Sequence, residues 1–225
     1  SIPSVPETRN VYVIVLFNGY STKIEGGAMK ANCSCTLIKA SKNVIVDTMT
    51  AWDRERIVEA LNRYNTTPAD IDYVVCTHSH ADHIGNNNLF TNAEHIVGTY
   101  TLSNHVLFLN AYGFMIILNA DEYILCPEVS VIATPGHTSD DVTVLAETET
   151  QGKSACFAVT GDLFEKEEDI LDPTIWQELG TLELRKTQSR MRSYIMNIAN
   201  FIIPGHGPMF CVTDYMRKIK EADSD

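Results

Sequence analysis

Residues 71–83 read IDYVVCTHSHADH, an apolar run that leads directly into three histidines and one aspartate. On the extended or looped segment after this run, His78 and His80 can point the same way, so one ion could bind both. Asp82 and His83 lie beyond the strand end and can reach a second ion. Imidazole nitrogens and carboxylate oxygens suit zinc at about 2.0–2.2 Å. The stretch therefore predicts a metal site at the end of a buried strand.

Three further candidate ligands each follow an apolar run and lie in or beside a glycine-bearing turn. His137 follows VIATPG, Asp162 follows FAVTG and His206 follows FIIPG. Strand ends that feed such loops are where proteins usually present functional groups. Together with the first cluster, these residues complete two coordination spheres.

The order His-x-His-x-Asp-His, then His, Asp and His, resembles the signature of the metallo-β-lactamase superfamily. Asp47 resembles the aspartate that precedes this motif in the family. The resemblance spans roughly residues 11–210, and the 225 residues fit a single domain, 1–225. It implies an α/β fold, a four-layer αβ/βα sandwich of two mixed β-sheets flanked by helices. Met49 stands where the family often has glycine, and Asn86 stands where it often has a second glycine.

The resemblance also implies how the ligands are divided. It implies that one metal is bound by His78, His80 and His137. The other metal would be bound by Asp82, His83 and His206, and Asp162 would bridge the two metals. Asp47 would orient the site through hydrogen bonds. We expect two Zn²⁺ per chain, with iron as the alternative, because these ligands suit both metals. Asp82 and Asp162 are also the candidate catalytic residues.

Paired metals lower the pKa of a bridging water and stabilise attacking and leaving oxygens, so the sequence predicts hydrolysis by a metal-bridging hydroxide. Residues 77–86, 133–137, 161–165 and 203–208 resemble an animal group of the superfamily associated with endonucleolytic RNA cleavage in histone pre-mRNA 3′-end processing. The resemblance implies a phosphodiesterase or endoribonuclease. The alternatives are a thioesterase or lactonase of glyoxalase II type, a mononuclear iron persulfide dioxygenase, and a non-catalytic scaffold.

The formal net charge of −12 opposes binding to RNA unless basic residues are clustered locally. Such a cluster is expected on the outward face of a helix over Leu182–Ile198, at Arg185, Lys186, Arg190 and Arg192. Aromatic residues that could stack on bases are Tyr12, Tyr20, Trp52 and Phe90. We therefore expect RNA or a small ester or thioester as partner, no membrane, and a homodimer as an open alternative.

Further helix and strand expectations follow from apolar periodicity. Strands are predicted at 11–17, 33–38, 43–47, 71–76, 94–97, 129–134, 142–146, 154–160 and 201–203, and a helix after Asp53. The acidic segment Gly161–Thr181, including residues 165–172, is expected to be a surface excursion. The six cysteines are expected to be buried free thiols. The first residues lack a signal-peptide pattern, so a cytoplasmic or nuclear location is expected.

Overall fold

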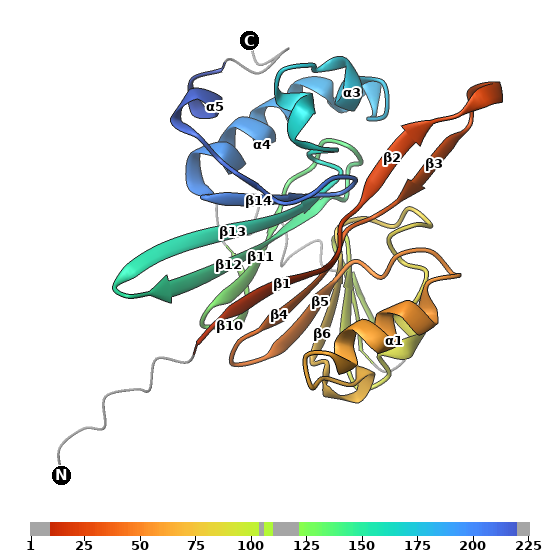
Figure 1. The fold of residues 1–225 in the computed structure, drawn as a ribbon, viewed down its shortest axis with the longest axis vertical. Helices are drawn as coiled ribbons and strands as arrows, with labels where there is room; N and C mark the ends of the chain where they lie inside the picture. Colours follow the sequence, from red (N-terminus) through yellow and green to blue (C-terminus); the bar gives the residue numbers. More distant parts are fainter. Residues whose placement is uncertain (1–9, 104–105, 110–121, 220–225) are drawn as a thin grey trace.

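The computed structural model describes residues 10–103, 106–109 and 122–219. Two β-sheets pack face to face, and helices lie over the outer face of each sheet (Figure 1). This is the predicted sandwich of two sheets flanked by helices, and the fold prediction is confirmed. Within the described ranges, no helix combines the length and the apolar character of a membrane span.

The first sheet has seven strands, ordered β1, β4, β5, β6, β7, β8 and β9. Their bounds are Tyr12–Phe17, Cys35–Lys39, Asn43–Val46, Tyr73–Cys76, Glu94–Val97, Tyr100–Ser103 and Val106–Leu109, respectively. The pairs β5–β6 and β6–β7 are parallel and the other pairs are antiparallel, so the sheet is mixed. Helix α1 (Arg54–Asn62) lies on its outer face (Figure 1).

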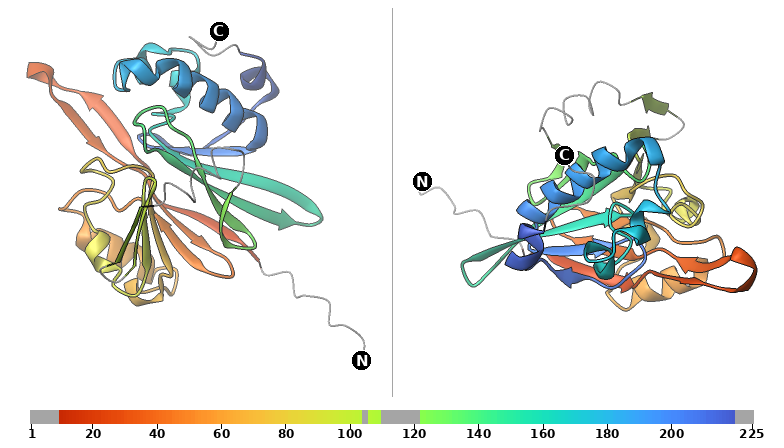
Figure 2. Two further views of the ribbon diagram at one scale, coloured as in Figure 1. Left: turned by 180° about the vertical axis from the view of Figure 1, so that it is seen from behind. Right: turned by 90° about the horizontal axis from the view of Figure 1, so that it is seen from above.

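The second sheet has six strands, β10 to β15 in sequence order. Their bounds are Tyr123–Cys126, Val129–Ala133, Val142–Thr150, Lys153–Gly161, Phe201–Pro204 and Phe210–Cys211. Helices α3 (Thr174–Gln177), α4 (Arg185–Ile198) and α5 (Asp214–Lys218) lie on its outer side. A two-stranded hairpin, β2 (Tyr20–Lys23) and β3 (Met29–Asn32), projects away from both sheets (Figure 2).

The alternation of side chains along β5 shows how the layers are held together. Val44 and Val46 join the cluster that contains residues of both sheets and of α4. Ile45 points the other way and packs in the cluster of Ile57 and Leu61 on α1. Successive side chains of a strand point to opposite faces, so an uninterrupted apolar strand packs against two layers. Each such buried side chain contributes about 1.5–3 kcal/mol.

The segment Gly161–Thr181 is partly core, and the expectation of a surface excursion was wrong. Phe164, Glu165 and Asp169 are buried, although the last two belong to the acidic stretch 165–172. Acidic side chains can be buried when they are paired, and Asp169 Oδ1 lies 2.8 Å from an Nη of Arg192.

Cysteine burial follows the sequence prediction with one exception. Five of the cysteines are buried free thiols, and Cys211 is exposed. Burial and the nearby charge of Glu147 raise the pKa of Cys156 to about 12, so this thiol stays protonated at neutral pH.

Candidate metal centre

The candidate ligands meet because the strands that precede them end at one edge of the sandwich. Strands β5 and β6 are parallel, as are β13 and β14, so each pair presents its carboxyl ends together. Asp47 follows β5, and the His-rich loop follows β6. Asp162 follows β13, and His206 lies two residues beyond β14. The loop after β11 supplies His137.

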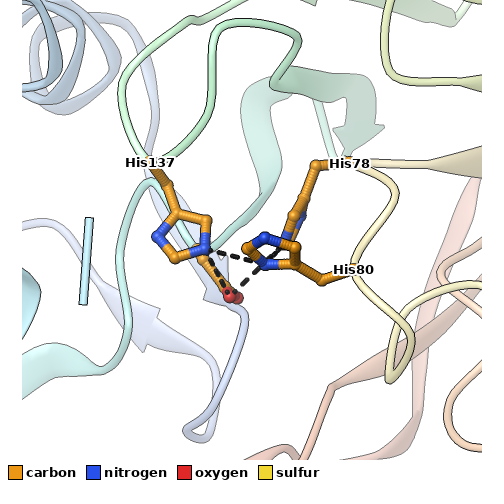
Figure 3. A group of neighbouring side chains, drawn as sticks. His78, His80 and His137 are labelled. Atoms are coloured by element: carbon orange, nitrogen blue, oxygen red, sulfur yellow. Dashed lines mark hydrogen bonds and ion pairs between the residues drawn. The ribbon is translucent and has the colours of Figure 1, made fainter. Parts of the chain in front are cut away.

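The first group consists of His78, His80, His137 and Asp162. Figure 3 shows its three histidines. His80 Nδ1 lies 2.9 Å from His78 Nε2 and 3.2 Å from His137 Nε2. Asp162 Oδ2 lies 3.6 Å from His78 Nε2 and 3.4 Å from His137 Nε2. Ligands at about 2.0–2.1 Å from a tetrahedral zinc ion are about 3.3 Å apart, so the spacing fits one ion.

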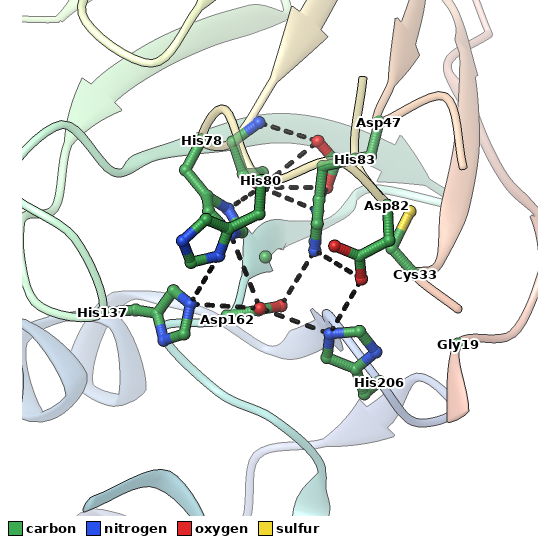
Figure 4. A network of polar contacts seen from close by, with 12 residues as sticks. Gly19, Cys33, Asp47, His78, His80, Asp82, His83, His137, Asp162 and His206 are labelled. Carbon is green, nitrogen blue, oxygen red and sulfur yellow. Dashed lines mark hydrogen bonds and ion pairs between the residues drawn. The ribbon is translucent and has the colours of Figure 1, made fainter. Parts of the chain in front are cut away.

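The second group consists of Asp82, His83 and His206, with Asp162 between the two groups (Figure 4). Asp82 Oδ2 lies 3.6 Å from Nε2 of His83 and 3.6 Å from Nε2 of His206. Asp162 Oδ1 lies 3.3 Å from His83 Nε2, and its Oδ2 lies 3.3 Å from His206 Nε2. The structure thus brings all seven predicted ligands together, with one carboxylate facing both groups.

Hydrogen bonds behind the rings determine which nitrogen faces the centre. His83 Nδ1 donates to Asp47 Oδ2 at 2.9 Å, and Thr77 N donates to Asp47 Oδ1 at 2.8 Å. His206 Nδ1 donates to the carbonyl oxygen of Asn32 at 3.0 Å. Both rings therefore turn Nε2 toward the centre, which is the role predicted for Asp47 in the case of His83.

The buried polar atoms of the centre fit a bound cation. His83 Nε2 and Asp162 Oδ1 are buried and, apart from their contact with each other at 3.3 Å, have no hydrogen-bond partner in the described part of the chain. Such atoms are costly unless something satisfies them, and a divalent metal would satisfy both. The imidazole and carboxylate donors suit zinc or iron.

Burial and neighbouring charges shift the pKa values of the groups in the centre. Burial and the neighbouring His83 hold the pKa of His78 well below its ordinary value, and burial lowers that of His137. Burial disfavours the charged form of His206, but Asp162 raises its pKa to about 9. Burial also opposes ionisation of Asp162, yet His83 and His206 hold its pKa well below the usual range.

Two backbone positions explain how loops approach this closely. A Cβ on Gly205 would collide with Asp162 Oδ1, so only glycine leaves room for that carboxylate. Met49 has φ 61°, the left-handed region that favours glycine. Asn86, the other departure from the family pattern, donates through Nδ2 to the carbonyl oxygens of Thr48 and Thr50. Both departures therefore lie in loops that the surrounding contacts hold in place.

The predicted RNA-contact face is only partly on the surface. Lys186 and Arg190 are exposed, whereas Arg185 is half-buried and donates to the carbonyl oxygen of Gln177. Arg192 is fully buried, so its placement on the outward face was wrong. Its guanidinium pairs with Asp169 and lies over the ring of Phe164, 4.1 Å from the centroid. Charge alone could not reveal this, because a paired arginine can occupy the inner face of a helix.

The aromatic candidates are likewise divided. The exposed residues are Tyr12, Tyr20 and Trp52, whereas Phe90 is fully buried and cannot stack on a base.

Two buried acids near the centre were not predicted. Glu165 Oε1 lies 3.8 Å from His137 Nδ1. Asp141 accepts from Thr138 N at 2.9 Å and so braces the loop of His137, and burial raises its pKa to about 7. The only sequence signal for Glu165 was its place in the stretch GDLFE at 161–165, which the resemblance singled out without a role.

Comparison with a family profile and with individual proteins identifies the same family for this chain. The Metallo-beta-lactamase superfamily profile matches residues 29–206. Metallo-beta-lactamase domain-containing protein 1 of Xenopus laevis is 37% identical over 214 residues, which cover 94% of this chain and 84% of that protein.

Solved structures with this fold are more distant in sequence. A Thermotoga maritima protein described as a metallo-β-lactamase has a TM-score of 0.61 at 18% identity, covering 90% of this chain and 99% of its own. An N-acyl homoserine lactone hydrolase with product at its metal centre has a TM-score of 0.56 at 19% identity, covering 89% and 93%. These likenesses concern the fold. The chain belongs to the metallo-β-lactamase superfamily of metal-dependent hydrolases.

Proposed function

We propose that this chain is a binuclear zinc hydrolase that cleaves phosphodiester bonds in RNA. The main support for a binuclear centre is the position of Asp162, whose carboxylate lies within 3.6 Å of imidazole nitrogens in both ligand groups. Two bound zinc ions would supply a hydroxide nucleophile at neutral pH and positive charge for the attacking and leaving oxygens.

The accessible side of the centre indicates where a substrate enters. Among the seven candidate ligands, His80 is exposed and Asp82 half-exposed, and the other five are buried. A substrate therefore approaches from the side of these two residues. There the Asp82 carboxylate can accept a hydrogen bond and a proton from the attacking water, and can then donate that proton to the leaving oxygen.

Support for RNA as the substrate comes from the sequence resemblance and from the chemistry of paired metals. The two exposed cations on α4, Lys186 and Arg190, are the candidates for contacts with the RNA backbone. Contacts of this kind make binding weaker as salt concentration rises.

The first test is metal content by mass spectrometry on protein purified without added metal, together with cleavage of a single-stranded RNA. Two zinc ions per chain and cleavage that a chelator abolishes are expected. The matched control is Asp162→Asn, which should cleave no RNA. A single iron would contradict the hydrolase proposal and favour oxygen chemistry, and a protein that binds no metal would favour a scaffold.

A second candidate is a hydrolase of a small lactone or thioester. Two observations favour it over RNA. The chain has a net charge of −12, and Arg192 is buried and so is absent from the expected RNA-contact face. The same zinc-loaded preparation should then be assayed with an N-acyl homoserine lactone and an acyl thioester. Turnover of either, with intact RNA, would replace the RNA proposal with this one.

A further inference from the structure

Within the described ranges, His137 lacks the hydrogen bond behind its ring that other imidazoles of the centre have. Its Nε2 faces the first ligand group, 3.2 Å from His80 Nδ1 and 3.4 Å from Asp162 Oδ2. Its Nδ1 therefore lies on the far side of the ring. That atom is buried and has no hydrogen-bond partner among the described residues.

Other rings of the centre show what such a partner does. His83 donates to Asp47, and His206 donates to the carbonyl oxygen of Asn32. Thr77 Oγ1 lies 3.3 Å from His78 Nδ1. A partner behind a metal-binding imidazole fixes the tautomer and the direction of the ring.

The carboxyl group of Glu165 faces the unpartnered nitrogen. Glu165 is buried, its Oε1 lies 3.8 Å from His137 Nδ1, and its Oε2 has no hydrogen-bond partner in the described part of the chain. The distance from Glu165 Oε1 to His137 Nδ1 is longer than the donor–acceptor distance of a hydrogen bond by less than about 1 Å. We propose that Glu165 is a positioning residue, whose carboxyl oxygen accepts the Nδ1–H of His137 and directs Nε2 toward the metal of the first group.

The backbone of Glu165 is fixed from two sides. Its amide donates to Asp169 Oδ2 at 2.7 Å, and its carbonyl accepts from the amide of His206 at 2.8 Å. Asp169 is itself held by Arg192 on α4. The carboxyl group is thus held beside the centre by contacts that do not involve a metal, and either protonation state presents an acceptor oxygen to His137.

A competing role is direct metal binding, because Glu165 Oε2 lies 4.0 Å from His206 Nε2 in the second group. Glu165→Gln separates the two roles. The amide keeps a carbonyl oxygen for the Nδ1–H of His137, but it lacks the anionic oxygen that a metal prefers. Glu165→Leu removes both, and Glu168→Leu changes an exposed carboxylate of the same segment as a control.

The inference rests on the binuclear centre of the proposed function, but its test needs no substrate. Zinc affinity is measured by competition with a chromogenic chelator. Glu165→Leu should weaken binding of one zinc ion by about 10–100-fold, and Glu165→Gln and Glu168→Leu should bind like the wild type. Wild-type affinity in Glu165→Leu would overturn the proposal. A loss in Glu165→Gln equal to that in Glu165→Leu would overturn it in favour of direct metal binding.

Proton NMR of the zinc-loaded protein gives a second readout, which also serves if Glu165→Leu fails to fold. The wild type and Glu165→Gln should both show a slowly exchanging imidazole N–H signal from His137 Nδ1. Absence of that signal in the wild type would overturn the proposal. RNA that stays intact in the activity assay would contradict the substrate proposal alone and leave these two readouts standing.

Discussion

Asp47 accepts a hydrogen bond from His83 Nδ1 at 2.9 Å and another from the backbone amide of Thr77 at 2.8 Å. One carboxylate thus ties the end of β5 to the loop that carries four candidate ligands. Asp47 has φ 60°, a conformation that non-glycine residues adopt mainly where the surroundings enforce it, often at functional sites.

Replacing Asp47 with asparagine should weaken zinc binding in the group that contains His83. The Asp47 carboxylate has two acceptor oxygens, one for His83 Nδ1–H and one for the Thr77 amide. The asparagine side chain has only one acceptor oxygen for these two donors, so the His83 ring loses its fixed direction. Loss of such a partner reduces metal affinity by about 10–100-fold, measurable by competition with a chelator. Asp214→Asn, at an exposed carboxylate, serves as the control. Equal affinities would show that Asp47 does not orient the ring.

Two arginines of α4 should differ sharply in their effect on stability. Arg192→Leu leaves Asp169 buried without its charged partner, which typically costs about 3–5 kcal/mol of unfolding free energy. Arg190→Ala, at an exposed position, should change it by less than about 0.5 kcal/mol. Urea denaturation of both variants measures the difference. Similar midpoints would mean that the buried pair contributes little.

The α4 surface should contribute to the salt dependence of RNA cleavage. Lys186→Ala combined with Arg190→Ala should reduce the slope of log activity against log salt, by about 0.7 for each lost phosphate contact to a single strand. Arg63→Ala, at an exposed position near the end of α1, should leave the slope unchanged. A slope that the double variant does not alter would rule out this surface as the RNA contact.

Gly205→Ala should disturb both ligand groups at once. The added Cβ would overlap Asp162 Oδ1, so the shared carboxylate must move. We expect loss of both zinc ions in metal analysis after dialysis, while far-UV circular dichroism stays that of the wild type. Full retention of two zinc ions would show that the loop can shift without moving Asp162.

The buried thiols should make the fold sensitive to alkaline pH. The pKa of Cys156 is raised from an ordinary value of 9.0 to about 12, so the native state keeps a proton that the unfolded chain loses between these values. Stability from this group is complete below pH 9 and falls by about 1.4 kcal/mol per pH unit above it. Cys156→Ala should therefore lose less stability than the wild type between pH 9 and 11. Urea titrations of the variant and the wild type at these pH values measure the two losses of stability. Equal losses would show that the Cys156 thiol has no role.

The sequence allowed the fold and the meeting of the candidate ligands to be predicted, because strand periodicity and the motif order are local signals. The β2–β3 hairpin was missed because Tyr20–Lys23 and Met29–Lys30 are largely exposed and lack a buried face. Position within the motif also did not reveal the φ of 61° at Met49, whose carbonyl oxygen accepts a hydrogen bond from the amide of Gly85.

The errors concern charged residues in the interior. Arg192 and Asp169 were assigned to the surface because isolated charges are rarely buried, and the sequence does not show that they form a pair. Glu165 was missed as a neighbour of His137 for the same reason, since 28 positions separate the two side chains in the chain.

The segment from Gly161 to Ile170 holds the shared carboxylate, the neighbour of His137 and the partner of Arg192 within ten positions. The Arg192–Asp169 pair therefore holds in place the same segment that carries the shared carboxylate. Weakening that pair should loosen the segment, so we expect exchange of a bound metal to quicken although the pair lies outside the centre.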